Sequence, residues 1–576
     1  MDEDRRTLLV RVRHHLFTAI IQIMSKTNGA SRPIKDGVRP LLEPLLEEIE
    51  RTEPWDSDSL QKILRNHPKS GGGMYAKDEL VRAYRLKQKE EGYKSKKVEE
   101  RIRMKPTRTN SGVAVVTVLT KPFPCPGNCI YCPNESNMPK SYIASEPGAQ
   151  RALSNKFDPY AQVFNRLIAL KNVGHNIEKV ELIILGGTWS YYDKEYQRSF
   201  IHDCFKALND VKEDSRDYVK PREEELKKAT WEDIDKVHKE NETAYCRNVG
   251  LVLETRPDYI TEEELIRMRR LGATKIQMGI QSLSNKILKK NRIGRKNDSV
   301  KNAFKLLRRM GFKIHGHWMP NLYGSTVKRD IKEYKKLWGK DYSPDELKIY
   351  PTSIIDNTHL NYLYQQGLYA PYTDRELTDL LKTVLPLTPR YCRLTRVVRD
   401  IPSNEIVAGN KKTNLRQLVQ QEMEKENIKM EDIRSREIRG EKVTEDMLEM
   451  EKIEYNTTVS KEIFISYKTK NTDKICGFLR LSLPKGKYRH KHFLDELKGC
   501  AIIREVHVYG KVLGLGKDSN GESQHLGLGK RLIEEAEKIS KDNDFKRISV
   551  ISAIGTREYY KKRGYQNINL YMHKNL

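Results

Sequence analysis

Three cysteines share one short loop of this sequence, which reads Lys121-Pro122-Phe123-Pro124-Cys125-Pro126-Gly127-Asn128-Cys129-Ile130-Tyr131-Cys132-Pro133. Their spacing is Cys-x3-Cys-x2-Cys, directly after an apolar run that predicts a β-strand. Three thiolates on one tight loop can hold three irons of a 4Fe–4S cluster and leave the fourth iron open. A zinc site needs a fourth protein ligand, and no further Cys or His lies at ribbon-like spacing nearby. The loop predicts Cys125, Cys129 and Cys132 as cluster ligands, with zinc and a distant fourth ligand as the alternative.

The cysteine loop opens a region in which short apolar runs alternate with helical stretches. Six runs rich in β-branched residues are predicted as strands: Val113–Leu119, Val180–Leu185, Gly250–Glu254, Lys275–Gln281, Lys313–Trp318 and Glu346–Tyr350. Near-continuous apolar strands separated by helices predict a parallel sheet covered on both faces. Six βα units are too few for a closed eight-stranded barrel, so we expect an α/β fold built on a partial (β/α)6 barrel. Its chemistry is expected at the carboxyl ends of the strands.

Motifs suited to a shared cavity follow several of these runs. The second run ends in Gly186-Gly187-Thr188, where glycine lets the backbone approach a ligand closely. The other motifs are Glu254-Thr255-Arg256-Pro257-Asp258, Gly279-Ile280-Gln281-Ser282, His315-Gly316-His317 and Tyr350-Pro351-Thr352. Each one alone is equally well explained as an ordinary turn after a strand. Together they predict a ligand cavity at one edge of the sheet.

A second glycine motif lies near the C-terminus, in Gln524-His525-Leu526-Gly527-Leu528-Gly529-Lys530. It opens a helix predicted over Leu528–Ile539, and glycines at a helix N-terminus expose backbone N–H groups to a pyrophosphate. Downstream, a phenol of the Tyr559-Tyr560 pair can hydrogen-bond a thioester carbonyl or protonate a departing thiolate. A glycine-capped loop and aromatic packing of one tyrosine are the structural alternatives. The predicted strands of this region are Ile463–Tyr467, Cys476–Leu483, Ile502–Val508 and Ile548–Ala553.

The charge balance points to a polyanionic partner. The 576 residues carry 106 Lys plus Arg against 79 Asp plus Glu, a formal charge of +27. A generally basic proteome is the alternative explanation. Tyr84 and Tyr93 lie within a basic stripe before the first strand and could stack on bases. The stripe suits phosphate contacts, which give affinity without sequence information, through Arg82, Arg85, Lys94, Lys96, Lys97, Arg101, Arg103, Lys105 and Arg108.

Composition sets the broad class and the division into regions. A hydrophobic fraction of 37% excludes wholesale disorder, and no apolar run approaches the ~18–20 residues that a bilayer span requires. The acidic N-terminus is unlike a signal peptide, so a soluble, cytoplasmic protein without membrane contact is expected. We expect five regions: an N-terminal helical region (1–80), a basic nucleic-acid-binding segment (81–112), the partial barrel (113–390), a helical linker (391–455) and a C-terminal α/β domain (456–576).

Both motifs resemble known families. The cysteine loop, with an aromatic residue before its last cysteine, resembles the radical S-adenosylmethionine superfamily. That resemblance implies that the open iron binds S-adenosylmethionine and that Gly186, Gly187, Thr188 and Gln281 line its site. The pattern Gln-x-x-Gly-x-Gly resembles the acetyl-CoA motif of GNAT acetyltransferases and favours Tyr560 over Tyr559 at the acyl group. It implies acetyl-CoA contacts from Gln524, Gly527, Leu528, Gly529 and Lys530, and from Glu505, Val506, His507 and Val508.

From about Lys94 onward the chain is similar to the family of Elongator catalytic subunits, in its archaeal form. The resemblance is carried by Arg108-Thr109-Asn110-Ser111-Gly112-Val113-Ala114-Val115-Val116, Asp158-Pro159-Tyr160, Arg399-Asp400-Ile401-Pro402 and Glu505-Val506-His507-Val508-Tyr509-Gly510. One departure is that eukaryotic members place more residues between the first two cysteines. No convincing zinc set is found among Cys204, Cys246, Cys392, Cys476 and Cys500.

That family implies carboxymethylation at C5 of the wobble uridine 34 of tRNA. An adenosyl radical would take hydrogen from the acetyl methyl group, the carbon radical would add to C5, and the thioester would then be hydrolysed. Lys179 matches a family position that contacts acetyl-CoA, here from across a domain boundary. The partners implied are the tRNA anticodon stem-loop and an electron donor for the cluster. A homodimer stays open, as do Elongator-like accessory subunits where a host has them.

Three other functions compete with this one. A protein lysine acetyltransferase with a structural iron–sulfur domain would transfer acetyl groups without S-adenosylmethionine. A tRNA methylthiotransferase usually brings three further cluster cysteines upstream, and residues 1–124 contain none. An RNA-binding scaffold with decayed sites conflicts with the intact cysteines and glycines of both motifs.

Overall fold

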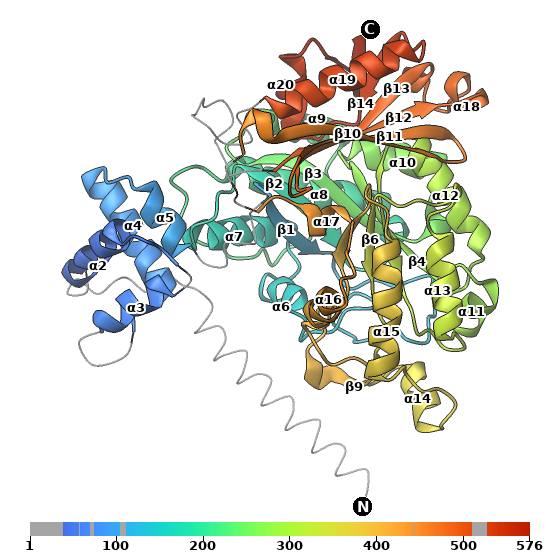
Figure 1. Ribbon diagram of the computed structural model, residues 1–576, viewed down its shortest axis with the longest axis horizontal. Helices are drawn as coiled ribbons and strands as arrows, with labels where there is room; N and C mark the ends of the chain where they lie inside the picture. The colour runs from blue at the N-terminus through green and yellow to red at the C-terminus, as the bar shows by residue number, and fades with distance from the viewer. Residues whose placement is uncertain are drawn as a thin grey trace, which may run out of the picture. The chain divides into compact units, whose positions relative to one another are not determined.

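The computed structural model describes residues 39–56, 58–68, 74–103, 111–439, 441, 443–509 and 527–576 (Figure 1). The chain divides into two compact units. One unit comprises Met1–Pro106, Phe164–His175 and Asp214–Val219, and the other comprises the remaining residues. Part of the predicted N-terminal helical region, up to residue 38, lies outside the described residues.

In the described residues of the N-terminal segment, helices of the first unit pack around one apolar core. They are α2 (Arg39–Arg51), α3 (Ser59–Asn66), α4 (Lys77–Glu91) and α5 (Lys96–Ile102). Leu45, Leu80 and Val98 come from three of them and are fully buried in that core. The Ser95 side chain caps α5 by accepting a hydrogen bond from the Val98 backbone N–H at 3.2 Å. An N-terminal helical region is therefore confirmed, and the expected boundary at residue 80 falls inside α4.

Seven parallel strands form an open barrel sheet in the second unit, in the order β1-β2-β3-β4-β5-β6-β8. Their bounds are β1 (Ala114–Leu119), β2 (Lys179–Leu185), β3 (Arg247–Thr255), β4 (Lys275–Gln281), β5 (Lys313–Trp318), β6 (Glu346–Ile349) and β8 (Arg393–Arg396). The partial barrel is confirmed and exceeds the prediction by one strand. That strand, β8, lies in the segment predicted to be a helical linker. Its sequence Arg-Leu-Thr-Arg offers one apolar residue, so no apolar run marks it.

Helices follow the strands and cover the outside of the sheet (Figure 1). One example is α12 (Asn297–Arg309), which packs on the sheet through one apolar face: Val300, Phe304 and Leu307 recur at helical spacing and are buried. The larger helices are α6 (Pro147–Ser154), α7 (Pro159–Asn172), α8 (Lys194–Asp210), α9 (Trp231–Asn241), α10 (Glu262–Arg270), α12 (Asn297–Arg309), α13 (Val327–Lys336), α15 (Asp374–Val384) and α16 (Leu415–Lys425). Smaller elements are α11 (Asn285–Lys290), β7 (Ile354–Ile355), α14 (His359–Gln365), β9 (Ile406–Ala408) and α17 (Ile433–Arg436).

The C-terminal domain is a mixed seven-stranded sheet in the order β10-β11-β12-β13-β14-β16-β15. Its parallel pair, β13 and β14, is in register only from Cys500 to Ile503, so the two strands separate beyond Ile503. The strands are β10 (Leu448–Asn456), β11 (Ser460–Thr469), β12 (Ile475–Pro484), β13 (Cys500–Val508), β14 (Arg547–Val550), β15 (Gln566–Ile568) and β16 (Tyr571–Asn575). The helices are α18 (Lys487–His490), α19 (Leu528–Asp542) and α20 (Arg557–Lys561).

The barrel and the C-terminal sheet share a packed, charged interface within the second unit. Gly311 lies so close to Ile502 that a Cβ there would sit 2.7 Å from the Ile502 Cγ2. The Tyr571 hydroxyl donates to the Met310 carbonyl at 2.7 Å. Arg504 and Asp345 form an ion pair with no exposed surface on either side chain. Among the described helices, none combines the length and apolarity that crossing a bilayer demands.

Candidate active site

The cysteine loop and the glycine motif after β2 meet at the carboxyl edge of the sheet. The Cys125 Sγ lies 3.6 Å from the Thr188 Oγ1, directly after Gly187. Cys125, Cys129 and Cys132 are partly exposed and unoxidised. The predicted cluster ligands and the predicted S-adenosylmethionine contacts are therefore neighbours, although 63 residues separate Cys125 from Thr188 in the chain.

Both glycines at the end of β2 adopt backbone conformations that favour glycine. Their φ angles are +133° at Gly186 and +100° at Gly187. A Cβ on Gly186 would also overlap the Thr120 hydroxyl. That hydroxyl donates to the Tyr192 Oη at 2.7 Å, and the Tyr192 hydroxyl in turn donates to the Gly186 carbonyl at 2.9 Å. The turn is thus held open and without side chains beside the cysteine loop.

Positive side chains surround the cysteine thiols. The Cys132 thiol hydrogen-bonds Cys129 and, together with Arg256 and Arg295, lowers the pKa of Cys129 to about 6. Thiolates are the form that ligates metal, so this environment favours ligation by Cys129, whereas the hydrogen bond with Cys129 and burial raise the pKa of Cys132. The guanidinium of Arg256 sits where a side chain at Gly127 would have to go.

The donor set fits an iron–sulfur cluster better than a single zinc ion. In the described part of the chain, no three His, Cys, Asp or Glu side chains converge on one ion position. In a 4Fe–4S cluster each thiolate binds a different iron, so three separated thiols on one loop suffice. The five remaining cysteines are buried.

Gln281 carries an unsatisfied polar atom at the end of β4. Its Oε1 is buried and has no hydrogen-bond partner among the described residues. Its backbone φ is +59°, and the register between β4 and β5 shifts between Gly279 and Gln281. Arg295 holds the same turn by donating to the Gly279 and Ile280 carbonyls at 2.7 Å each, and its Nη1 likewise lacks a described partner. Unsatisfied buried groups are rare in proteins and mark a place where a ligand can complete the hydrogen bonds.

Below this edge, the barrel interior holds a polar cluster. The Tyr142 hydroxyl donates to Glu254 at 2.9 Å, and the Glu254 carboxylate lies 3.6 Å from the His317 Nδ1. The Gln277 Oε1 accepts from the Lys348 Nζ at 2.8 Å and lies 3.2 Å from the His317 Nε2. Burial raises the pKa of Glu254, lowers that of His317 well below its usual value, and lowers the pKa of Lys348 to about 8. Such a cluster can bind and orient a polar heterocycle.

The second predicted site forms at the start of α19. Gly527 has φ +65° and precedes Leu528, Gly529 and Lys530, which make the first turn of the helix. A Cβ on Gly529 would lie 2.6 Å from the Tyr559 hydroxyl and 3.7 Å from the Val508 Cγ2. The glycine turn, β13 and α20 therefore converge, while Gln524 lies outside the described residues.

The two tyrosines of α20 occupy different surroundings. The Tyr560 ring is buried, 5.4 Å from the Tyr559 ring and 5.7 Å from the Tyr565 ring. Tyr559 is partly exposed and faces the glycine turn. Burial raises the pKa of both phenols, so both stay protonated and able to donate at neutral pH.

Two polar side chains near the end of β13, those of His507 and Glu505, differ in whether they have a partner. The His507 Nε2 is buried without a described partner, and burial lowers the pKa of His507 to about 4. Glu505 instead pairs with Lys313 of β5 and with Arg480 of β12 at 2.8 Å. The Glu505 side chain therefore belongs to the interface between the two domains. Val506 lies opposite Leu479 of β12.

Lys179 lies at the opposite end of the barrel from the cysteine loop. It begins β2 and lies opposite Arg247 of β3, and burial lowers its pKa. Gly555, just before α20, packs so closely on this strand that a Cβ would sit 2.6 Å from the Arg247 Cβ. The amino ends of the barrel strands therefore adjoin the tyrosine helix. The cysteines and the tyrosines are separated by the length of the strands, about 20 Å for seven residues.

The predicted nucleic-acid stripe divides into exposed and internally bound residues. Lys94, Lys96 and Lys97 are exposed on α5 and just before it, and Lys97 also pairs with Glu53 at 3.2 Å. Arg101 instead donates to the Ile49 carbonyl at 2.6 Å and pairs with Glu53 at 2.8 Å. Arg85 donates a hydrogen bond to the Asn172 side chain at 3.4 Å, and Arg103 donates one to the Gly174 carbonyl at 3.0 Å. Arg82 is partly buried. Lys105 and Arg108 lie outside the described residues.

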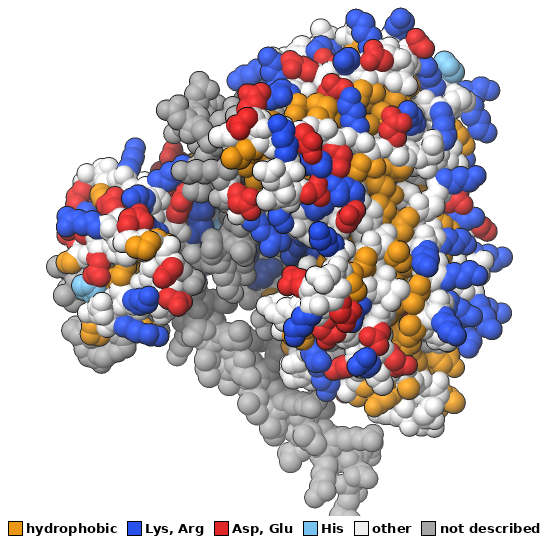
Figure 2. All heavy atoms as spheres, viewed as in Figure 1, with side chains coloured by type: hydrophobic (Ala, Val, Ile, Leu, Met, Phe, Trp, Pro, Cys, Tyr) orange, Lys and Arg blue, Asp and Glu red, His pale blue; other side chains and the backbone are white. Residues whose placement is uncertain are grey.

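Tyr84 cannot stack on a base, because its ring is in the core and its hydroxyl donates to the Ser95 carbonyl at 3.0 Å. Tyr93 is partly buried and donates to Glu50 at 2.5 Å. Figure 2 shows another basic surface along α11 and α13 that the sequence pattern did not single out. It consists of the exposed Lys286, Lys289, Lys290, Lys328, Lys332, Lys335 and Lys336.

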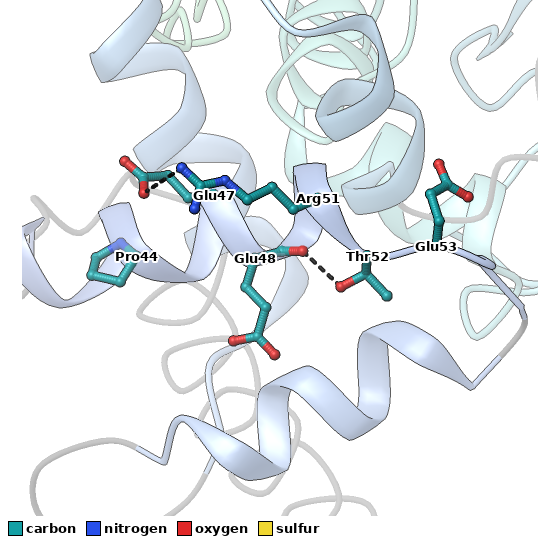
Figure 3. Close-up of a pocket in the computed structure, with 6 residues that line it drawn as sticks. All are labelled: Pro44, Glu47, Glu48, Arg51, Thr52 and Glu53. Carbon is teal, nitrogen blue, oxygen red and sulfur yellow. Dashed lines mark hydrogen bonds and ion pairs between the residues drawn. The ribbon is translucent and has the colours of Figure 1, made fainter.

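Two surface hollows lie in different units. One, of about 550 Å³, is lined by the cysteine loop and the residues after it, including Phe123, Cys125, Asn128 and Lys140. The other, of about 440 Å³, lies on α2 and is lined by Pro44, Glu47, Glu48, Arg51, Thr52 and Glu53 (Figure 3). The second is lined by three carboxylates and is poorly suited to an anionic ligand. The first adjoins the candidate cluster site.

Comparisons with known proteins agree with this geometry. Residues 124–334 match the family described as Radical SAM superfamily, and residues 344–425 match the Radical_SAM C-terminal domain. A protein named tRNA uridine(34) acetyltransferase from Methanocaldococcus jannaschii is 36% identical, over 94% of this chain and 98% of that protein. Elongator complex protein 3 of Saccharomyces cerevisiae is 35% identical, over 83% of this chain and 85% of that protein.

A solved structure extends the likeness to three dimensions. The archaeal Methanocaldococcus infernus Elp3 with an N-terminal deletion has a TM-score of 0.67 and is 34% identical. The match covers 81% of this chain and 99% of that structure, so it includes both the barrel and the C-terminal sheet.

Proposed function

This chain belongs to the family of tRNA uridine(34) acetyltransferases and Elongator complex protein 3, and we propose that it places a carboxymethyl group on C5 of uridine 34 in tRNA. The reaction would use S-adenosylmethionine radical chemistry and acetyl-CoA. One observation carries this proposal: a single compact unit contains both the cysteine loop, at one end of the barrel, and the glycine–tyrosine site, at the other end.

Cys125, Cys129 and Cys132 would hold the 4Fe–4S cluster, and the open turn at Gly186 and Gly187 would receive the methionine end of S-adenosylmethionine. The unpartnered Gln281 Oε1 would accept a hydrogen bond from the same ligand. When bound, the cluster and S-adenosylmethionine would supply the radical that takes a hydrogen atom from the acetyl methyl group and leaves a carbon radical for addition to C5.

Acetyl-CoA would bind where β13 and β14 separate. The first turn of α19, from Gly527 to Lys530, presents backbone N–H groups and the positive end of the helix to its pyrophosphate. Tyr560, or Tyr559 beside it, would donate a hydrogen bond to the thioester, and Lys179 would contact the cofactor from the barrel side. Glu505 would support this site through Lys313 and Arg480.

The tRNA would contribute one unstacked base and many phosphates. A base paired or stacked in the anticodon loop cannot reach the barrel interior, so uridine 34 must be splayed out of the loop. Exposed basic side chains such as Lys94, Lys96 and Lys97 would contact phosphates of the anticodon stem-loop. A cellular electron donor must reduce the cluster.

The test is anaerobic reconstitution with iron and sulfide, followed by incubation with tRNA, S-adenosylmethionine, acetyl-CoA and dithionite. Mass analysis of the digested nucleosides should show 5-carboxymethyluridine, and omission of either cofactor should abolish it. Carboxymethyluridine formed without S-adenosylmethionine would contradict the proposal. Acetyl transfer to protein lysines with no change in the tRNA would favour the lysine acetyltransferase alternative.

A further inference from the structure

Three lysines face the concave interior of the barrel on neighbouring strands. They are Lys275 of β4, Lys313 of β5 and Lys348 of β6. Lys275 reaches Glu181 of β2 at 2.7 Å and Glu346 of β6 at 3.1 Å. Each of those strands is two positions away from β4, so side chains can meet in this way only on the concave side.

Two of the three lysines are neutralised. Lys275 has the two carboxylates just named, and Lys313 has Glu346 at 3.2 Å and Glu505. Their neighbours raise the pKa of Lys275 even though burial opposes it. These ion pairs hold the barrel and the interface together, and they leave each of the two ammonium groups one N–H donor and no uncompensated charge.

Lys348 differs from the other two. Among the described residues, no carboxylate lies within ion-pair distance of its ammonium, and its one hydrogen bond goes to the Gln277 Oε1 at 2.8 Å. An ammonium has three N–H donors, so two remain for a ligand. Burial lowers the pKa of Lys348 to about 8, although the charges of Glu254 and Glu346 oppose the shift. A buried cation without an ion-pair partner costs stability, and a ligand that accepts its hydrogen bonds would offset that cost.

The position of Lys348 along the barrel is also distinctive. In strand register it shares a row with His317, and His317 shares that row with Gly279. This row is nearer the carboxyl edge than the row of Gln277, His315 and Glu346. The Tyr350 ring follows at the strand end, 5.8 Å from the His317 ring. Lys348 therefore lies between the ion pairs of Lys275 and Lys313 and the carboxyl edge that carries the cysteine loop, beside the rings of His317 and Tyr350.

We propose that Lys348 binds the reacting base, donating a hydrogen bond to the C4 carbonyl of uracil while His317 and Tyr350 flank the ring. This inference rests on the proposed function, since it names the group that recognises the splayed uridine. Uracil presents a carbonyl acceptor at C4, next to the reacting C5. Cytosine presents an amino donor there, which an ammonium cannot bind. Lys348 thus selects uracil and aligns C5 toward the centre of the barrel.

Binding measurements test this without relying on turnover. The reconstituted full chain is titrated with fluorescent anticodon stem-loops that carry uridine or cytidine at position 34. The wild type should prefer uridine about tenfold or more, the range expected for a hydrogen bond to a charged group. Lys348→Met should remove the preference and leave binding of the cytidine stem-loop unchanged. Lys348→Arg, which keeps a donor, should retain part of it, and Lys546→Met, at an exposed lysine just before β14, should behave as the wild type.

A preference for uridine that survives in Lys348→Met overturns the inference. A photo-crosslink keeps it testable if that variant misfolds: 5-bromouridine at position 34 should crosslink to β6 or β5 in the wild type. Crosslinks confined to other segments also overturn it. Failure of the proposed function is recognised separately, because the wild type would then form no carboxymethyluridine, whereas failure of this inference leaves wild-type product formation intact.

Discussion

Arg504 of the C-terminal sheet donates two hydrogen bonds, each of 2.7 Å, to the Asp345 carboxylate just before β6 of the barrel, and both side chains are fully buried. Arg504 also pairs with Glu462, and Arg308 contacts both carboxylates. These contacts join the two domains through charge that has no access to water. The two candidate sites therefore belong to one compact unit of the chain.

We predict that Asp345→Asn destabilises the chain by about 3–5 kcal/mol, because it leaves buried guanidinium groups without their carboxylate. Burial opposes ionisation, yet Arg308 and Arg504 hold the pKa of Asp345 well below its usual value. The stabilisation is therefore present above the unfolded pKa near 3.9 and is lost as pH falls through the folded pKa. Chemical denaturation at several pH values measures it. Equal stability of variant and wild type at neutral pH would contradict the assignment.

We predict that Cys129→Ser lowers bound iron from about four atoms per chain to near zero after anaerobic reconstitution. Cys476→Ala, which removes a buried cysteine far along the chain, is the matched control and should keep its iron. Metal analysis and visible absorbance give the readout. Zinc bound in place of iron, or full iron loading in Cys129→Ser, would refute the ligand set.

We predict that Gly529→Ala weakens acetyl-CoA binding at least tenfold, because its Cβ would lie 2.6 Å from the Tyr559 hydroxyl at the glycine turn. Cleavage of S-adenosylmethionine should be retained. Gly148→Ala in α6 is the control, since a Cβ there would lie 3.7 Å from the Leu119 Cδ1, which is an ordinary van der Waals distance. Calorimetric titration with acetyl-CoA decides the matter, and unchanged affinity in Gly529→Ala would place the cofactor elsewhere.

We predict different kinetic defects for the two tyrosines. Tyr560→Phe should lower kcat for thioester hydrolysis by about a hundredfold, the effect of losing a general acid. Tyr559→Phe should mainly raise KM, because its hydroxyl adjoins the turn that would bind the pyrophosphate. Steady-state kinetics with tRNA present separates the two effects. The opposite pattern would assign the proton donor to Tyr559.

We predict that combined Lys94→Ala, Lys96→Ala and Lys97→Ala weakens tRNA binding similarly for all sequences. It should also reduce the salt dependence of binding, by about 0.7–0.9 in logarithmic slope for each lost phosphate contact. Alanine at Lys328, Lys332 and Lys336 on α13 gives the comparison. If the α13 variant loses affinity and the first does not, the phosphate surface lies on α11 and α13.

The sequence predicts the barrel well where strands are buried on both faces. The runs Lys275–Gln281 and Lys313–Trp318 match β4 and β5 at both ends, and their apolar residues span most of each strand, from Ile276 to Ile280 and from Ile314 to Trp318. β8 leaves no such mark, since a short edge strand of Arg-Leu-Thr-Arg is stabilised by its neighbours rather than by its own residues.

Side-chain roles are harder to predict than strands. Glu505 stands at a strand end, where sequence suggests a ligand contact, but its partner Lys313 is 192 residues away. The pattern around Tyr84 does not reveal that its ring packs inside the helical core. Lys348 is equally invisible in sequence, because it differs from Lys275 in having no carboxylate within ion-pair distance among the described residues of the fold.

The most direct test of the whole account uses acetyl-CoA whose methyl group is fully deuterated, with reconstituted enzyme, tRNA and S-adenosylmethionine. The account predicts one deuterium in the 5′-deoxyadenosine product and two in the carboxymethyl group on uridine 34. Unlabelled 5′-deoxyadenosine alongside the modified uridine would contradict it, because the two ends of the barrel would then not act on the same acetyl group.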